Sequence, residues 1–263
     1  MIPKIIHYCW YGRGKKDALT ERCIASWEKY CPDYQIIEWN EDNCDIASSV
    51  WAREAYESKK WAFVADYFRL KAMFEYGGIY MDTDVEVIKN LDPFLANEAF
   101  VSYADDTYIG SGMFGCSKGN VFCKKLLEYY ENRHFINDDG SYYDVPNNQI
   151  YTMICSKVLN LIWGSNKIDY GSVNIYPSDY FAPFKKRTIG KPEKIYNPDN
   201  FDCTENTYAI HYTVYSWAKT NSSLKTRMKL YFNQAVRLAL PRNVYFSLKR
   251  KSKISEMENR VQF

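Results

Sequence analysis

Residues 61–84 of this chain read WAFVADYFRLKAMFEYGGIYMDTD, and this segment gives the clearest evidence for the fold. Apolar side chains recur at helical spacing across its first part and predict one buried helix face: Phe63, Tyr67, Leu70 and Phe74. A glycine pair at 77–78 follows, and glycine is the residue that most often ends a helix. The sequence therefore predicts a helix over residues 61–76 that stops at these glycines.

Directly after the glycines, the apolar residues 79–81 predict a short buried strand that leads into two carboxylates, Asp82 and Asp84. The residues before the helix alternate between strand-like and helix-like segments: 4–8, 16–30, 34–39 and 48–58. This alternation is typical of an α/β fold with a doubly wound parallel sheet. Ligands of such sheets bind at the carboxyl ends of the strands, and the carboxylate pair lies at one such end. The pattern therefore favours a binding site at Asp82 and Asp84.

The remainder of the chain is less regular. Further elements are predicted as strands at 100–103 and 108–116, helices at 120–132 and 147–160, and loops with short strands over 164–210. We interpret residues 1–221 as one Rossmann-like domain and residues 222–263 as a basic, amphipathic, helical C-terminal segment.

The balance of charge argues against one class of function. The 263 residues carry 34 Lys and Arg and 32 Asp and Glu, a net charge of +2, which gives no signature of nucleic-acid binding. Residues 222–263 differ, because their 10 Lys and Arg against 2 Asp and Glu are interleaved with aliphatic residues. Such a segment fits an anionic membrane surface, and a solvated terminal helix packed on the domain is an equally good interpretation.

Nothing in the sequence predicts secretion or a membrane span. The start, MIPKIIHYCWYG, is too short and too polar for a signal peptide, and no run of about 18 apolar residues occurs. The eight cysteines form no C-x-x-C pair, so neither a zinc ribbon nor a thioredoxin-type site is predicted. We expect free, mostly buried thiols in a cytoplasmic protein.

Asp82 and Asp84 stand one residue apart after a strand, so both can approach one hard cation. Mg²⁺ and Mn²⁺ suit oxygen ligands, and Mg²⁺ usually binds substrate phosphates together with one or two carboxylates. The preceding helix carries Asp66 and Arg69, which are three residues apart and therefore neighbours on one face. These patterns predict a metal–diphosphate site beside a polar pair. A D-x-D sequence is also common by chance in surface turns, and such a helix pair is also common as a surface ion pair.

Four parts of the sequence stand in a recognisable order: IPKIIHYCW at 2–10, ADYFR at 65–69, YGGIYMDTD at 76–84 and, more weakly, IHY at 210–212 with Ser216 and Trp217. Together they resemble the DXD sugar-binding region of glycosyltransferases, most closely family 32, which contains capsular-polysaccharide and yeast initiating mannosyltransferase-like enzymes. The combined order and spacing is specific, whereas no single part is. The resemblance implies a GT-A fold, a nucleotide-sugar donor, Mn²⁺ or Mg²⁺, and retention of the anomeric configuration.

The resemblance also implies roles for individual residues. Asp84 would ligate the metal directly, Asp82 would lie between metal and donor, and His211 would be a further ligand. Asp66 would accept hydrogen bonds from hydroxyls of the donor sugar, with Arg69 beside it. The nucleotide sugar would also contact residues near the ends of several strands: His7, Trp10, Tyr11, Tyr80, Gly110 and Ser111.

Two later pairs complete the predicted site. Ser216 and Trp217 would hold the leaving diphosphate, although the residues between them and His211 differ from the usual motif. Asn148 and Gln149 resemble in position the Asp-Gln element of related retaining transferases, which would place them near the anomeric carbon. An asparagine at a helix start is also a common N-cap.

Two other interpretations fit part of the sequence. Residues 82–85 also match the D-x-D-x-[TV] loop of haloacid-dehalogenase-like phosphatases, with Asp82 as nucleophile, but that loop normally follows a first strand and here two predicted strands precede it. A non-catalytic sugar-binding module would explain the 17% of aromatic residues, which also simply fill cores. The intact carboxylates Asp66, Asp82 and Asp84 argue against such a degenerate site.

The resemblance leads to an expected biological setting. We expect a UDP-hexose donor such as UDP-galactose or UDP-glucose, with GDP-mannose as the alternative. The expected acceptor is a saccharide on a polyprenyl lipid carrier, as in bacterial capsule or O-antigen synthesis. The expected location is the cytoplasm, peripheral on the inner face of the cytoplasmic membrane, with no nucleic-acid partner.

Overall fold

The computed structural model describes residues 1–105, 108–143, 145–157, 173–186 and 197–213, with the single residues Val244, Met257 and Val261. Ser216, Trp217 and all but these three residues of the basic segment 222–263 lie outside the described part. Within it, no helix has both the length and the apolar character that a membrane crossing requires.

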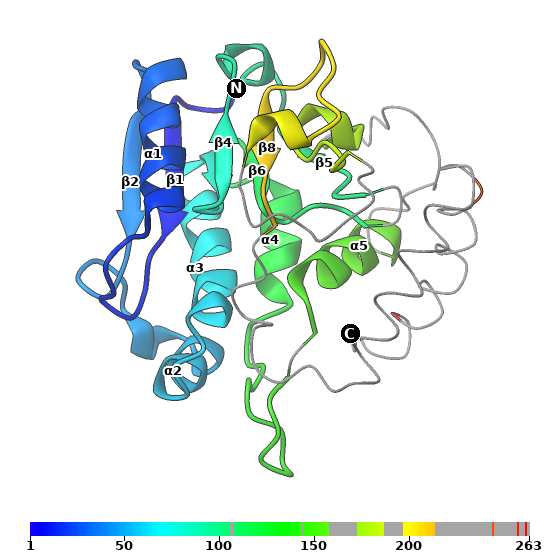
Figure 1. Cartoon of the computed structure of the whole chain (residues 1–263). Coiled ribbons are helices and arrows are strands. Elements are labelled where there is room, and N and C mark those ends of the chain that lie inside the picture. Colours follow the sequence, from blue (N-terminus) through cyan, green and yellow to red (C-terminus); the bar gives the residue numbers. More distant parts are fainter. Residues whose placement is uncertain are drawn as a thin grey trace.

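A sheet of six strands forms the centre of the fold, in the spatial order β2-β1-β3-β6-β5-β7 (Figure 1). Its strands are β1 (Ile5–Cys9), β2 (Gln35–Trp39), β3 (Gly78–Met81), β5 (Ala99–Ser102), β6 (Met113–Cys116) and β7 (Asn174–Tyr176). β1 is parallel to both β2 and β3, as predicted. β6 is antiparallel to β3 and to β5, whereas β5 and β7 are parallel. The α/β class and the parallel arrangement of β1, β2 and β3 are therefore confirmed, and the antiparallel β6 makes the whole sheet mixed.

The change of direction begins in the segment after β3. The chain leaves the sheet at Asp82, and β4 (Val85–Val87) pairs with β8 (Ala209–His211) in a second, two-stranded antiparallel sheet. β5 and β6 then form an antiparallel pair, which needs no crossover helix. β4 was not predicted, because a three-residue strand carries too little alternation to be recognised.

Five α-helices are described: α1 (Ala18–Tyr30), α2 (Val50–Glu57), α3 (Trp61–Tyr76), α4 (Val121–Glu128) and α5 (Asn147–Lys157). Their apolar side chains form two cores on opposite faces of the sheet. β3 alternates between them, since Tyr80 belongs to the core of α2 to α5, whereas Ile79 and Met81 belong to the core of α1, β4 and β8. The sheet is thus covered on both faces, as in a doubly wound fold.

Helix α3 has the predicted bounds and the predicted stop. The Gly77 N–H donates to the Met73 carbonyl at 2.9 Å, and Gly77 has a φ of 68°, which favours glycine. A Cβ at this position would lie 2.5 Å from the Lys118 backbone nitrogen. Gly77 therefore lets the chain turn sharply from α3 into β3, which leads to Asp82.

Other predicted bounds shift. The strand predicted at 108–116 is reduced to β6, because residues 110–112 form an irregular segment before it. The helix predicted at 120–132 ends at Glu128, and residues beyond Lys157 in the helix predicted at 147–160 lie outside the described part. All eight cysteines are free, as predicted, and Cys44 is half-buried while Cys203 is exposed.

Candidate functional site

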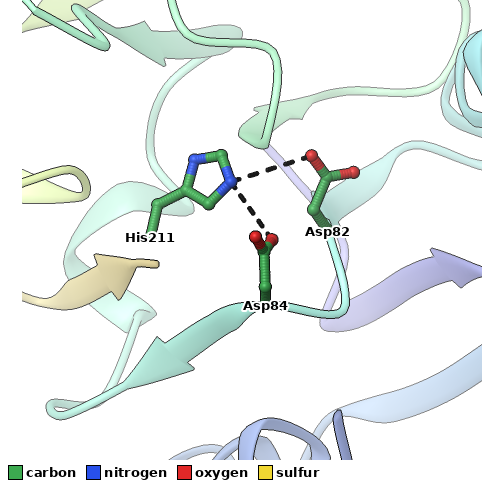
Figure 2. A group of neighbouring side chains, drawn as sticks. All are labelled: Asp82, Asp84 and His211. Atoms are coloured by element: carbon green, nitrogen blue, oxygen red, sulfur yellow. Dashed lines mark ion pairs between the residues drawn. The ribbon is translucent and has the colours of Figure 1, made fainter. Parts of the chain in front are cut away.

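Three metal-ligating side chains converge where β3 leaves the sheet. Asp82 and Asp84 come from the turn between β3 and β4, and His211 is the last residue of β8. Figure 2 shows the imidazole ring facing both carboxylates. Its Nε2 lies 3.1 Å from Oδ1 of Asp84 and 4.0 Å from Oδ2 of Asp82. One ligand atom from each residue lies within 4.8 Å of the other two, so the three can reach one cation.

The small sheet explains why residues so distant in sequence meet. In the β4–β8 ladder, Val85 stands opposite His211, and the Tyr212 N–H donates to the Asp84 carbonyl at 3.0 Å. β4 is itself fixed to α1, because the Trp27 indole N–H donates to the Val85 carbonyl at 2.8 Å. The second sheet therefore positions His211 against the D-x-D turn.

Gly112 makes room for this arrangement. Its carbonyl accepts a hydrogen bond from the Asp82 N–H at 2.7 Å. A Cβ on Gly112 would lie 2.3 Å from Cε1 of His211, a separation that no folded protein tolerates without movement. Only glycine at 112 lets the backbone hold Asp82 while the imidazole lies against it.

Arg69 links the carboxylate of Asp66 in α3 to the D-x-D turn. Its guanidinium is buried and forms ion pairs with Oδ1 of Asp66 at 3.0 Å and with Oδ1 of Asp82 at 3.1 Å. It also donates to the Ser111 carbonyl at 3.1 Å and lies 4.6 Å from the centre of the Tyr80 ring. This predicted pair is therefore a buried part of the site and not a surface ion pair.

The two oxygens of Asp82 have different surroundings. Oδ1 accepts from the Tyr80 hydroxyl at 3.0 Å in addition to Arg69, whereas Oδ2 is the oxygen nearer His211. Loss of solvent raises the pKa of Asp82, Arg69 lowers it, and the neighbouring Asp84 raises it again, with a raised pKa as the result. Asp82 can therefore offer Oδ2 to a cation while Arg69 and Tyr80 hold Oδ1.

The electrostatics of the cluster favour a bound cation. Burial lowers the pKa of His211, but Asp84 and Asp82 raise it by more, so the net shift is upward. Carboxylates brought together with partial loss of water are stabilised by positive charge. Two carboxylates and an imidazole suit Mn²⁺, and the carboxylates suit Mg²⁺. The residues present therefore fit the expected divalent ion, which Asp82, Asp84 and His211 could hold together.

Asp66 occupies a second polar position near Arg69. The residue is 7% exposed, and its Oδ1 accepts from the Asn147 side-chain amide at 2.8 Å. Burial raises the pKa of Asp66 to about 6, Arg69 opposes this, Asp82 adds to it and Asn147 opposes it. A buried carboxylate beside the ion-binding cluster can accept hydrogen bonds from hydroxyl groups of a sugar.

The predicted pair Asn148 and Gln149 lies in the first turn of α5, directly after Asn147. The buried Oδ1 of Asn148 and Oε1 of Gln149 have no hydrogen-bond partner within the described residues. An unpaired buried acceptor costs about 1–3 kcal/mol. Such atoms are expected where a ligand supplies the missing donors, and the roles of both residues remain predictions.

The residues predicted to contact the nucleotide differ in burial and in hydrogen-bond partners. Trp10 is half-buried and its indole N–H donates to the Gly14 carbonyl at 2.7 Å. Tyr11 is buried and its hydroxyl donates to Sγ of Cys44 at 3.1 Å. Gly110 donates its N–H to a backbone carbonyl of β5, and Ser111 accepts from Arg69, so this loop borders the cluster.

His7 is fully buried, and both ring nitrogens are engaged within the fold. Nδ1 accepts from the Trp39 indole N–H at 3.0 Å, so Nε2 carries the proton and donates to the Gly77 carbonyl at 2.8 Å. Burial lowers its pKa to about 4, although the bond to Gly77 acts in the opposite direction. This geometry supports a structural role and offers no nitrogen for the predicted nucleotide contact.

Two residues of the cluster, Asn147 and Tyr130, were not assigned roles from the sequence. Gly112 was expected, with Gly110 and Ser111, to allow a close approach at the border of the sugar or acceptor, but nothing in the sequence indicated that an imidazole would lie against it. Asn147 adjoins the predicted pair, and Tyr130, which donates to Oδ1 of Asn147 at 2.8 Å, is one of 24 tyrosines without a distinguishing pattern. Only the contacts reveal them.

Comparison with known proteins finds relatives of the segment that carries Asp66, Arg69 and the D-x-D turn. Residues 17–101 match the family described as glycosyltransferase sugar-binding region containing DXD motif. Inositol phosphoceramide mannosyltransferase 3 of Schizosaccharomyces pombe is 32% identical over 146 residues, 51% of this chain and 40% of that protein. Mannosyl phosphorylinositol ceramide synthase CSH1 of Saccharomyces cerevisiae is 26% identical over 196 residues, 68% of this chain and 49% of that protein. The chain thus spans less than half the length of these relatives.

Solved structures give weaker likenesses. The PaToxG glycosyltransferase has a TM-score of 0.48 at 17% identity, over 60% of this chain and 70% of that one. The galactosyltransferase LgtC has a TM-score of 0.42 at 14% identity, over 91% of this chain and 98% of that one. Both scores are below 0.5. The family match is the firmer finding: over residues 17–101 this chain is related to glycosyltransferases whose sugar-binding region contains a DXD motif.

Proposed function

We propose that this chain is a glycosyltransferase that binds a nucleotide sugar with the help of a divalent cation and transfers the sugar to a hydroxyl group of an acceptor. The convergence of Asp82, Asp84 and His211 carries this proposal, because these side chains form a cation site inside a sequence related to DXD glycosyltransferases. Arg69 and Asp66 adjoin the same site. The α/β fold fits the GT-A architecture expected from the sequence.

Asp84, Asp82 through Oδ2, and His211 through Nε2 would hold Mn²⁺ or Mg²⁺. When bound, the ion supplies positive charge that stabilises the leaving diphosphate. In the overall reaction, the bond between the anomeric carbon and the phosphate oxygen breaks. A bond from that carbon to the acceptor oxygen forms, the acceptor hydroxyl loses its proton, and a nucleoside diphosphate leaves.

The remaining residues of the site would position the donor. Asp66 accepts hydrogen bonds from sugar hydroxyls, and Arg69 holds Asp66 and Asp82 at a fixed separation because it pairs with both. Fixed donors and acceptors lower the barrier by orienting the reacting groups before the reaction. Asn148 and Gln149 face the anomeric carbon, and the transfer retains the anomeric configuration.

The relatives widen the set of candidate donors and acceptors. Their names specify mannosyl transfer and a phosphoinositol ceramide, whereas the sequence led us to favour a UDP-hexose and bacterial capsule synthesis. We therefore place GDP-mannose beside UDP-galactose and UDP-glucose as candidate donors, and a glycolipid headgroup beside a polyprenyl-linked saccharide as candidate acceptors. A lipid acceptor fits a cytoplasmic enzyme that contacts an anionic membrane through residues 222–263.

A thermal-shift screen of nucleotide sugars, each with and without Mn²⁺, tests the proposal. A ligand that binds the native state raises stability by RT ln(1 + [L]/Kd), so the true donor should raise the melting temperature only when metal is present. Hydrolysis or transfer of that donor should then follow by chromatography of the nucleoside diphosphate. No shift with any nucleotide sugar in saturating Mn²⁺ would reject the proposal.

Assays on the same purified protein distinguish this proposal from the two other interpretations, a phosphatase and a sugar-binding module. A phosphatase would release phosphate from phosphomonoesters. It would use the Asp82 carboxylate as its nucleophile, but one of the two oxygens, Oδ1, is already held by Arg69 and Tyr80. A sugar-binding module would bind glycans without metal and without donor cleavage. Neither interpretation accounts for His211 beside the D-x-D turn.

A further inference from the structure

The buried carboxylate of Asp66 is held from two sides at one oxygen. Arg69 and the Asn147 amide both meet Oδ1, at 3.0 and 2.8 Å. The second oxygen is then left to accept a hydroxyl group of a ligand. The orientation of this carboxylate therefore depends on Asn147 as well as on Arg69.

The side-chain amide of Asn147 can serve Asp66 only with its NH₂ end, because a carboxylate has no proton to donate. The opposite end, Oδ1, accepts from the Tyr130 hydroxyl at 2.8 Å. Asp66 thus selects the end of the amide that faces it, and Tyr130 holds the other end in place. Without the hydroxyl, the amide keeps one anchor and can rotate about its own bonds.

Tyr130 is itself rigidly held. It is 1% exposed, and its ring packs edge-on against Trp51 of α2 with the ring centres 5.0 Å apart. The Trp51 indole N–H donates to the carbonyl of Phe63, one turn before Asp66 on α3. The contacts form a closed brace from α2 through Tyr130 and α5 back to α3.

We propose that Tyr130 is a positioning residue, which acts through Asn147 to fix the Asp66 carboxylate in the orientation that binds the donor sugar. This inference rests on the proposed function. Tyr130 and Asn147 both lie outside residues 17–101, so these two members of the brace are not part of the region that matches the family.

The chain offers a matched control in the adjacent tyrosine. Tyr129 is also buried, but its hydroxyl is hydrogen-bonded to that of Tyr143 at 2.6 Å. Tyr130→Phe and Tyr129→Phe remove the same atom, and each keeps its ring. The expected result is a fall in kcat/KM for the donor of about fivefold for Tyr130→Phe, the loss typical of one hydrogen bond, and no change beyond about 1.5-fold for Tyr129→Phe.

A double-mutant cycle tests whether Tyr130 acts through Asn147. Asn147→Ala removes the amide, so adding Tyr130→Phe to it should cause no further loss. An equal fivefold loss in the Asn147→Ala background, or the same effect from Tyr129→Phe, would overturn the proposal. Because each Phe variant keeps the packing, melting temperatures should fall little and equally for both.

A measurement without ligand separates this inference from the proposed function. The charged and titratable groups that face Asp66 are Arg69, Asp82, Tyr130 and Tyr151, and the Asn147 amide favours its charged form. NMR titration of the Asp66 carboxyl should therefore give a higher pKa in Tyr130→Phe than in wild type, with Tyr129→Phe unchanged. If the wild-type chain transfers no sugar, the proposed function fails, and an unchanged Asp66 pKa in Tyr130→Phe would overturn the brace itself.

Discussion

Two largely buried histidines, His7 in β1 and His211 in β8, show that neighbouring charges decide whether burial determines the pKa of a side chain. His7 lies between an indole N–H and a backbone carbonyl, and burial lowers its pKa to about 4. His211 lies beside two carboxylates, which raise its pKa despite burial. The His7 ring has both nitrogens hydrogen-bonded within the core and stays neutral, whereas the His211 ring lies in an acidic cluster that suits a cation.

Asp84→Asn should have the largest effect on the His211 region, because it removes the anionic oxygen 3.1 Å from Nε2. We expect transfer to fall by at least about 100-fold, since loss of the bound cation removes the stabilisation of the leaving diphosphate. Steady-state kinetics at saturating Mn²⁺ would measure this. Asp42→Asn, which removes an exposed partner of Arg13, is the matched control and should behave as wild type. If Asp84→Asn, assayed in EDTA, turned over substrate as fast as the wild-type enzyme does with Mn²⁺, the proposed cation site would be refuted.

Substitution of each histidine in turn tests directly whether His211 binds the cation and His7 stabilises the fold. His211→Ala should weaken Mn²⁺ binding by about 10- to 100-fold, with little loss of stability. His7→Phe should leave Mn²⁺ affinity unchanged but lower the free energy of unfolding by about 2–3 kcal/mol, because the Trp39 indole and the Gly77 carbonyl lose their partner. Calorimetric Mn²⁺ titration and urea unfolding of both variants would test this. The reverse pattern would mean that the two histidines have been assigned the wrong roles.

Gly112→Ala should have a smaller effect on the same region. The added methyl would lie 2.3 Å from the His211 ring, so the ring must move away from the carboxylates. We expect Mn²⁺ affinity to fall several-fold, by less than in His211→Ala. Gly14→Ala is a suitable control, since a Cβ there meets nothing within 4 Å. Equal affinity in both alanine variants would show that the imidazole does not need the space.

The pH dependence of stability should have opposite signs for the two histidines in metal-free protein. The pKa of His7 falls from 6.5 to about 4 on folding, so its share of stability declines as the pH drops from 6.5 to 4, by roughly 3 kcal/mol in full. The pKa of His211 rises on folding, so its contribution is complete below pH 6.5 and is lost as the pH rises through the folded value. NMR titration of the two imidazoles, assigned with His211→Ala, would measure both. A His211 pKa below that of His7 would contradict this description.

The sequence predicted the parts of the molecule that depend on neighbours along the chain. The helix at 61–76 and its stop at Gly77 follow from spacing and from glycine's conformational range, and the structure has the same bounds. Asp82, Asp84 and His211 were grouped by resemblance to a family, and the structure brings them together. Short-range patterns and family motifs were therefore sufficient for the centre of the site.

The parts that were missed depend on contacts across the fold. A three-residue strand such as β4 has no pattern of its own and exists because β8 pairs with it. His7 lies in a motif-like opening, and only its two hydrogen bonds show that its nitrogens are occupied. The Tyr130 hydroxyl donates to Asn147, which lies 17 residues later in the chain, so no helical or strand spacing marks it.

The most direct test is a crystal structure of this chain with Mn²⁺ and a nucleoside diphosphate, with the ion located by its anomalous scattering. We expect one strong anomalous peak within about 2.0–2.3 Å of an oxygen of Asp84 and of Nε2 of His211, with diphosphate oxygens completing its shell. A peak elsewhere, or none between these side chains at saturating Mn²⁺, would contradict it.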